Sequence, residues 1–430
     1  MASPTLAFRR GLGSTGSDEA TFLPLCPPGE RIRQKKQWAR YTVRTMPDDP
    51  TEVPSVLTGI DVLARDKFAA LFGASVGLVT NHTGLLRDGK TATADALHAA
   101  PNVSLRALFA PEHGIRGAVD APVLDATDDA TGLPVYSLYG ARQEPTPEML
   151  TGLDTLVYDI QDIGTRFYTY LSTLGHVLHV AGATGLRVVV CDRPNPIGGV
   201  AVEGSLSDDT RLSFTAFHPI PVRHGMTLGE LALLLNAERG FNANVTVVKC
   251  EGWRRTDYYD ATGLLWTNPS PNMRSANAAL TYPGVGLLEF TNISVGRGTD
   301  TPFEIVAAPW INARAFAHAL NTRALPGVRF VPITVTPRAS LCAGELCGGV
   351  QIIVTDRVKF VPVRTGFEIA LTLRALYENE WQASKYMTLL ANRSVMDGLL
   401  AGEDYAALSK RWQPDLRGFL TARKEFLLYE

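Results

Sequence analysis

Cysteine is scarce in this 430-residue chain, and the five cysteines that occur are scattered along it. Their number is odd and none forms a CxxC pair, so neither a disulfide framework nor a cysteine zinc site is expected. Cys342 and Cys347 lie close enough in sequence to pair locally, but two buried free thiols are the simpler interpretation.

Long apolar runs and an excess of one charge sign are also missing. No stretch approaches the roughly 20 apolar residues that cross a bilayer, so no membrane span is expected. The 41 basic and 43 acidic residues nearly cancel, which does not favour a nucleic-acid partner. The composition, 45% hydrophobic and 20% charged, is ordinary for a globular protein, and the length favours two domains.

The first 46 residues differ from the rest of the chain. They carry eight Lys or Arg against three Asp or Glu, without apolar periodicity, which is typical of a disordered basic leader. No apolar core of roughly 7 to 15 residues with a small-residue cleavage site follows the start, so no signal peptide is predicted. We assign residues 1–55 to this leader. The expected compartment is the cytoplasm by default, with export open if the true start is Met46.

Strand and helix patterns alternate from about Gly59 onward. Short runs rich in β-branched residues predict buried parallel strands at residues 76–80, 105–109, 155–159, 187–192 and 245–249. Helical patterns occur at residues 61–72, 91–100, 168–183 and 227–239. This alternation predicts a Rossmann-like, doubly wound parallel sheet.

A second, smaller α/β domain is predicted after a Gly- and Pro-rich stretch that ends near residue 300. Its expected helices are residues 313–323 and 367–377, and its expected strands are residues 328–335 and 349–355. The domains are therefore predicted as 56–300 and 301–430. A cleft between two domains is a usual place for a ligand.

Polar residues follow four of the five strands predicted in the first domain. These exits span residues 81–84, 111–114, 159–162 and 192–196. Parallel strands end at one rim of a sheet, so the four exits should converge on a ligand site there. Loops are polar in any case, but that explanation suits one or two exits better than four.

Glu112 is the candidate general acid. Pro111 ends the preceding strand and Gly114 permits a tight turn, so Glu112 and His113 should lie just past the sheet edge. A partly dry position would raise the pKa of the Glu112 carboxyl as acid catalysis requires. The structural alternative is a salt bridge to Arg116.

Glycoside cleavage usually needs a second group opposite the acid, and Asp159 and Asp162 are the candidates. Asp162 could instead pair with Arg166. Tyr168 and Tyr170 could offer hydroxyls or a stacking face to a sugar, or belong to the core.

An anionic ligand is suggested by Arg193, Arg223 and Arg297, because guanidinium matches a carboxylate in geometry. His224 could be catalytic, although a satisfied loop histidine is commoner.

Residues 84–91, GLLRDGKT, fit the phosphate-loop pattern, and Asp159 could then help to hold Mg²⁺. However, the four residues between the glycines are bulky or charged where backbone amides would have to wrap phosphates. A turn at Asp88 and Gly89, with Thr91 as a helix N-cap, is favoured over nucleotide binding.

A metal site could collect His82, His113, His224, Asp159, Asp162 and Asp192. No pair of them has the spacing of a known metal motif, so no metal and no cofactor is predicted.

Seven motifs together resemble the peptidoglycan exo-β-N-acetylmuramidase family of the NamZ type, formerly a domain of unknown function. They are VGLVTNHTG (76–84), LFAPEHGIRG (108–117), YDIQDIGTRFYTY (158–170), CDRPNPIGG (191–199), RHGMTLGE (223–230), SPNM (270–273) and TNISVGRGTDTPFE (291–304). The resemblance runs from about residue 56 to the C-terminus. It implies a Rossmann-like domain and a smaller domain around a cleft.

The resemblance further implies release of terminal N-acetylmuramic acid from the non-reducing end of peptidoglycan fragments. The family's PEHG glutamate, its proposed acid/base, falls on Glu112. The lactyl carboxylate of this sugar would suit Arg166, Arg223 or Arg297. Its acetamido group could act as internal nucleophile, oriented by Asp159 or Asp162, or one of these carboxylates could attack directly.

The prediction is therefore a glycosidase with Glu112, Asp159 and Asp162 as catalytic residues. The expected substrate-binding residues are Asn81, His82, His113, Arg166, Tyr168, Tyr170, Asp192, Arg193, Asn195, Arg223, His224, Asn292 and Arg297. The alternatives are a non-catalytic binding protein for anionic muropeptides and, less favoured, a phosphate-loop enzyme.

Overall fold

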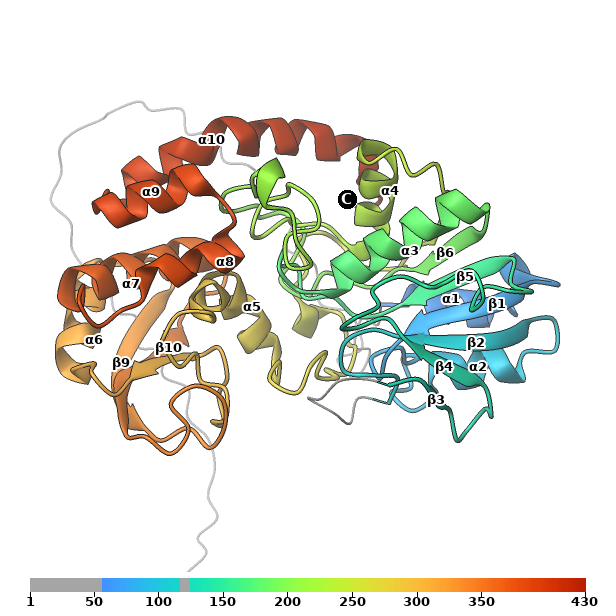
Figure 1. The fold of residues 1–430 in the computed structure, drawn as a ribbon, viewed down its shortest axis with the longest axis horizontal. Helices are drawn as coiled ribbons and strands as arrows, with labels where there is room; N and C mark the ends of the chain where they lie inside the picture. Colours follow the sequence, from blue (N-terminus) through green and yellow to red (C-terminus); the bar gives the residue numbers. More distant parts are fainter. Residues whose placement is uncertain (1–55, 117–123) are drawn as a thin grey trace, which may run out of the picture. The chain divides into compact units, whose positions relative to one another are not determined.

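The computed structural model describes residues 56–116 and 124–430, so the predicted leader, residues 1–55, lies outside the described residues. The described residues belong to one compact unit, Val53–Glu430. It contains a large sheet, a small sheet and the helices that cover them (Figure 1). Among the helices described, none is long and apolar enough to cross a membrane.

The large sheet has seven strands in the order β3-β4-β2-β1-β5-β6-β7. The five predicted strands are confirmed as β1 (Ser75–Thr80), β2 (Ser104–Ala110), β5 (Thr155–Asp159), β6 (Arg187–Cys191) and β7 (Asn244–Val248), all parallel. Two short edge strands were not predicted, β3 (Ala126–Thr127) and β4 (Pro134–Ser137). Their brevity leaves too little pattern to detect.

Helices cover both faces of the large sheet, which confirms the doubly wound prediction (Figure 1). Val157 and Val189 pack with residues of α1 (Gly59–Arg65) and α2 (Thr93–Ala99) on one face. The alternate residues Tyr158 and Val190 pack with α3 (Tyr170–Thr184) and α4 (Leu228–Glu238) on the other. Successive side chains of a strand point to opposite faces, so these strands are apolar throughout.

The small sheet is antiparallel, in the order β8-β10-β9. Its strands are β8 (Ile305–Ala308), β9 (Val328–Val335) and β10 (Cys347–Val354), and β8 was not predicted. Helix α6 (Ala313–Thr322) agrees with the prediction. Helix α7 (Pro362–Leu376) starts five residues earlier than predicted, because its first residue is a proline, which the first helical position tolerates.

The remaining helices join the two sheets. Helix α5 (Ala276–Val285) precedes the small sheet, and α8 (Met387–Leu390), α9 (Arg393–Ala401) and α10 (Tyr405–Ala422) follow it. Helix α10 runs from α9 back toward α4 (Figure 1). Past α10, Tyr429 donates its hydroxyl to Asp192 at the end of β6 (2.6 Å). The C-terminal tail is therefore bound to the large sheet.

The cysteines described are all free thiols, as the simpler interpretation expected. Cys347 is buried and Cys342 is only partly buried.

Arg166 is fully buried and links segments that are far apart in the sequence. Its guanidinium donates to the carbonyls of residues Ser205 and Ile220 (2.8 and 3.1 Å) and of Leu389 and Leu390 (2.8 and 2.7 Å). The predicted pairing with Asp162 does not form. The structure places this arginine in the fold rather than at a surface that a ligand could reach.

Arg166→Met should lower the free energy of unfolding by roughly 3 kcal/mol or more, because four buried carbonyls lose their donors. Urea denaturation would measure this loss. Arg393→Met is the matched control, since Arg393 pairs with Asp397 on the surface and should cost less than about 1 kcal/mol. Equal effects of the two substitutions would contradict the proposed structural role.

Candidate active site

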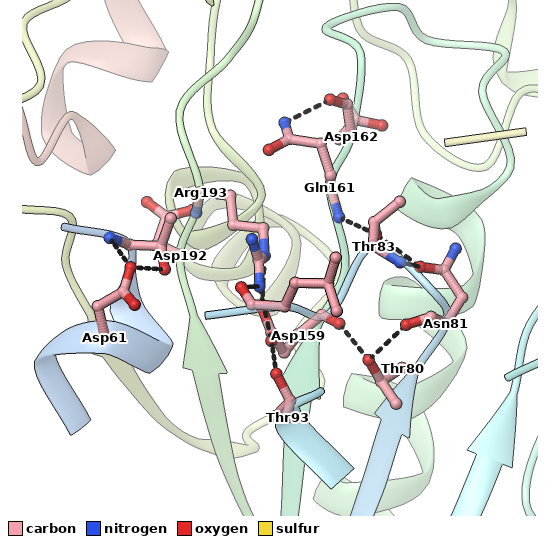
Figure 2. Close-up of polar contacts among 12 residues, drawn as sticks. Asp61, Thr80, Asn81, Thr83, Thr93, Asp159, Gln161, Asp162, Asp192 and Arg193 are labelled. Carbon is pink, nitrogen blue, oxygen red and sulfur yellow. Dashed lines mark hydrogen bonds and ion pairs between the residues drawn. The ribbon is translucent and has the colours of Figure 1, made fainter. Parts of the chain in front are cut away.

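The ends of β1, β5 and β6 converge, as predicted, but their polar side chains bind one another (Figure 2). The Gln161 amide donates to the hydroxyl of Thr83 (2.9 Å), and Thr80 donates to the Asp159 carbonyl (2.7 Å). The Asn81 side chain accepts from the amide and hydroxyl of Thr83. This part of the sheet edge is consequently closed by its own hydrogen bonds.

Asp159 is fully buried in an ion pair with Arg193. The guanidinium donates to both carboxylate oxygens (2.6 and 2.9 Å), and the hydroxyl of Thr93 donates to one of them (2.5 Å). The pair therefore joins β5, the loop after β6 and the first turn of α2. Its groups are engaged within the fold.

The phosphate-loop segment, residues 84–91, is already occupied by one of its own side chains. The Asp88 carboxylate accepts from the amides of Lys90 and Thr91 and from the Thr91 hydroxyl. The predicted turn is present, with Gly89 at φ +66°. The N-cap prediction for Thr91 is wrong, because α2 begins at Thr93 and its N-cap is Ala92. Amides held in this way are not available to wrap phosphates.

Asp162 and His224 form a second buried pair. His224 Nε2 lies 3.8 Å from Asp162 Oδ2, which also accepts from the Gly164 amide (2.7 Å). Burial raises the pKa of Asp162 to about 7. Burial, with three nearby arginines, lowers the pKa of His224 to about 3. The imidazole is therefore neutral near pH 7, and the carboxyl binds a proton there far more readily than an exposed aspartate.

Three further predicted binding residues hold the fold together. Asp192 accepts from the Thr227 hydroxyl (2.7 Å) and the Gly229 amide (2.8 Å) at the start of α4. Asn195 donates to the Met226 carbonyl (2.9 Å). The third, Arg223, is buried in an ion pair with Glu203.

Asn292 also makes fold contacts, since it binds the backbone of Glu380 and Gln382. His82 donates from Nε2 to the Asn268 carbonyl (2.6 Å), and burial lowers its pKa. His113 contributes to the same shift, so the two histidines lie near each other.

A cavity of about 200 Å³ lies beside these buried networks. Its walls bring together five predicted residues, Glu112, His113, Tyr168, Tyr170 and Arg297. The other residues that line it are Tyr139, Phe167, Thr169, Phe214, Thr215, Ser270, Asn272, Met273, Tyr282, Glu289, Phe290, Phe303 and Leu389. Neither Asp159 nor Asp162 lines it, nor do Arg166, Arg193 or Arg223.

Glu112 enters the cavity from the turn after β2. His113 and Gly114 both have positive φ, +74° and +73°, which confirms the predicted tight turn. One Glu112 oxygen accepts from the Thr169 hydroxyl (2.7 Å). The alternative salt bridge to Arg116 is wrong, since Arg116 pairs instead with Asp95 of α2 and with Asp128.

Aromatic rings form much of the cavity wall. Tyr168 packs edge-on against Tyr170 and Tyr282, with centroids 5.0 and 6.0 Å apart. Tyr168 is buried, and its hydroxyl lies close to Ser270. Tyr168 and Tyr170 were expected either to contact a sugar or to belong to the core. Both belong to the core and also line the cavity.

Sequence reasoning missed Glu289, a second carboxylate in this cavity. It forms an ion pair with Arg297, and Tyr282 donates its hydroxyl to it (3.4 Å). The available signal was a lone acid that closes the apolar run before the TNISVGRG motif.

Within residues 56–116 and 124–430, His, Cys, Asp and Glu side chains form no group of three or more that could hold a metal ion.

Comparison with known proteins identifies relatives over nearly the whole described chain. Residues 76–277 match the family model described as exo-beta-N-acetylmuramidase NamZ, N-terminal, and residues 280–429 match its C-terminal counterpart. The peptidoglycan beta-N-acetylmuramidase NamZ of Bacillus subtilis is 42% identical over 381 residues, which cover 87% of this chain and 92% of that protein.

Two solved structures share the fold. Both are DUF1343 family proteins from Bacteroides fragilis. The first has a TM-score of 0.83 at 38% identity and covers 88% of this chain and all of its own. The second has a TM-score of 0.72 at 28% identity and covers 87% of this chain and 99% of its own.

The raised pKa of Asp162 predicts a pH-dependent stability. The folded state binds this proton up to about pH 7, whereas the unfolded state releases it near pH 3.8. The contribution of Asp162 to the free energy of unfolding is therefore fully present below pH 3.8. It falls as the pH rises from 3.8 to about 7, and it is constant at higher pH. Asp162→Asn cannot ionise, so its stability relative to the wild type should rise by a few kcal/mol, about 1.4 per pH unit, across this window.

Urea denaturation from pH 4 to pH 8 would measure this difference, and Asp209→Asn, at an exposed position, is the control. A difference that does not change with pH would refute the assignment.

Proposed function

Because the chain belongs to the exo-β-N-acetylmuramidase NamZ family, we propose that it is an exo-acting glycoside hydrolase. It releases terminal N-acetylmuramic acid from the non-reducing end of peptidoglycan fragments. The observation that carries this proposal is the position of the PEHG glutamate. Glu112 lines a cavity that is also formed by residues of the family's second matched segment.

The chemistry of the cavity suits an amphipathic, anionic sugar. Aromatic faces such as Tyr168 and Phe290 can pack on the apolar face of a pyranose ring, while hydroxyl and amide groups bind its polar rim. Arg297 supplies a guanidinium for the lactyl carboxylate. Of the three arginines considered for this role, it is the one that lines the cavity.

Glu112 acts as the general acid and base. Its protonated carboxyl gives a proton to the glycosidic oxygen as the bond from that oxygen to the anomeric carbon breaks. A water molecule then adds its oxygen to the anomeric carbon and returns a proton to Glu112. The Thr169 hydroxyl holds one carboxyl oxygen and thereby orients the side chain.

A non-catalytic binding protein for anionic muropeptides would use the same cavity. It would bind the substrate saturably and yield no product, so product formation separates the two functions. The phosphate-loop alternative has no support from the geometry of residues 84–91, whose amides are held by Asp88.

Glu112→Gln should lower the release of N-acetylmuramic acid from a muramyl-glucosaminyl disaccharide by about 10²- to 10⁴-fold, because the amide cannot donate the proton. Mass spectrometry of the products would measure this, with the thermal transition as a check on folding. Glu148→Gln changes an exposed glutamate and should keep full activity. Undiminished turnover in Glu112→Gln would remove the acid/base assignment.

A further inference from the structure

The cavity contains two carboxylates among its described lining residues, Glu112 and Glu289. Glycosidases commonly use a pair of carboxylates, one as proton donor and the other as an anion beside the anomeric carbon. Asp159 and Asp162 were the pair expected from sequence, and both are buried. Asp159 contacts Arg193, and Asp162 lies near His224. The second carboxylate therefore has to be sought among the residues that line the cavity.

Glu289 is held rigidly by charge and hydrogen bonding. It follows a short 3₁₀ helix, Gly286–Leu288, and pairs through Oε1 with Arg297, while Tyr282 donates to Oε2. Its side chain is 15% exposed, so the ion pair is largely shielded from water. A cation and a hydroxyl donor both favour the ionised carboxylate.

Open space lies on both sides of this ion pair. Glu289, Phe290 and Arg297 line the first cavity and also a neighbouring cavity of about 280 Å³, together with Ser294 and Leu341. A salt bridge that serves only the core would be enclosed by side chains. The Glu289 carboxylate instead forms part of a wall that a ligand can contact.

The two carboxylates differ in their partners. Glu112 accepts a hydrogen bond from the neutral hydroxyl of Thr169. Glu289 lies against a guanidinium. Burial is the largest influence on Glu289 and raises its pKa above the usual value, although Arg297 and Tyr282 oppose that shift. The guanidinium in contact with Glu289 marks it as the anionic member of the pair.

We propose that Glu289 is the second catalytic carboxylate, which stabilises the positive charge that develops on the sugar ring, in place of Asp159 and Asp162. This role rests on the proposed function. The proton moves from Glu112 to the leaving oxygen, which also takes the electron pair of the broken bond. Water supplies the new oxygen at the anomeric carbon and reprotonates Glu112. Glu289 stays ionised throughout, so it neither gains nor loses an atom.

The test compares Glu289→Gln with Glu112→Gln on two substrates, a muramyl-glucosaminyl disaccharide and the 4-nitrophenyl β-glycoside of N-acetylmuramic acid. Nitrophenolate leaves without protonation, so Glu112→Gln should retain much of its activity on the second substrate. Glu289→Gln should lose at least about 100-fold in kcat on both substrates, because charge stabilisation is needed in either case. In Glu289→Gln, kcat should also no longer fall toward acidic pH, because the amide cannot be protonated as the carboxylate is.

Glu304→Gln is the matched control. Glu304 is a partly buried glutamate that binds Ser275 and Asn277 and does not line the cavity, so this variant should keep wild-type kcat. If Glu289→Gln does not fold, Glu289→Asp keeps the charge and should retain more activity than Glu289→Ala.

A Glu289→Gln protein with near-normal kcat and a raised KM would overturn the proposal, because Glu289 would then only hold Arg297 for binding. Equal activities of Glu289→Asp and Glu289→Ala would overturn it as well. Absence of product from the wild type on both substrates would instead refute the proposed function.

Discussion

The buried ion pair between Asp159 and Arg193 joins the carboxyl ends of β5 and β6. In open α/β sheets the crevice past the carboxyl ends of the strands is the usual binding site. Here, at the end of β5, Arg193 and Thr93 engage both oxygens of Asp159. Removing one member would leave an uncompensated buried charge, which generally costs about 3 to 5 kcal/mol. The cavity lies past the carboxyl end of the neighbouring strand β2, at the turn that carries Glu112.

The cavity depends on long-range assembly. Its walls come from the turn after β2, from the segment before α3, from the stretch around α5 and from Leu389. Arg166 supports this arrangement by donating to carbonyls of residues more than two hundred positions away. The C-terminal tail adds a second link, because Tyr429 binds Asp192. Neither matched segment of the family could form the cavity alone.

The two carboxylates of the cavity have different partners, and a glycosidase needs carboxylates in two different roles. A general acid must exchange its proton during each turnover. An anion that stabilises developing positive charge must stay ionised, which a guanidinium partner favours. Glu112 accepts from the Thr169 hydroxyl, and Glu289 pairs with the Arg297 guanidinium.

Local pattern in the sequence was sufficient for much of the fold and for the family. Strand periodicity located β1, β2, β5, β6 and β7, and the Pro111 to Gly114 turn placed Glu112 at the edge of the sheet. These features depend on neighbouring residues, whose spacing is visible in the chain. The short strands β3, β4 and β8 carry too few residues to leave such a pattern.

Only the tertiary structure decided which charged residues meet the cavity. Asp159 and Arg193 are 34 positions apart, and their local sequence does not indicate that they form an ion pair. Arg166 resembled a ligand-binding cation until its carbonyl partners were placed, and Glu289 gave only the weak signal of one acid in an apolar stretch. Whether a charged side chain is free to act on a ligand depends on which partners the folded chain brings to it. Those partners come from distant segments, so residue type and spacing alone do not specify them.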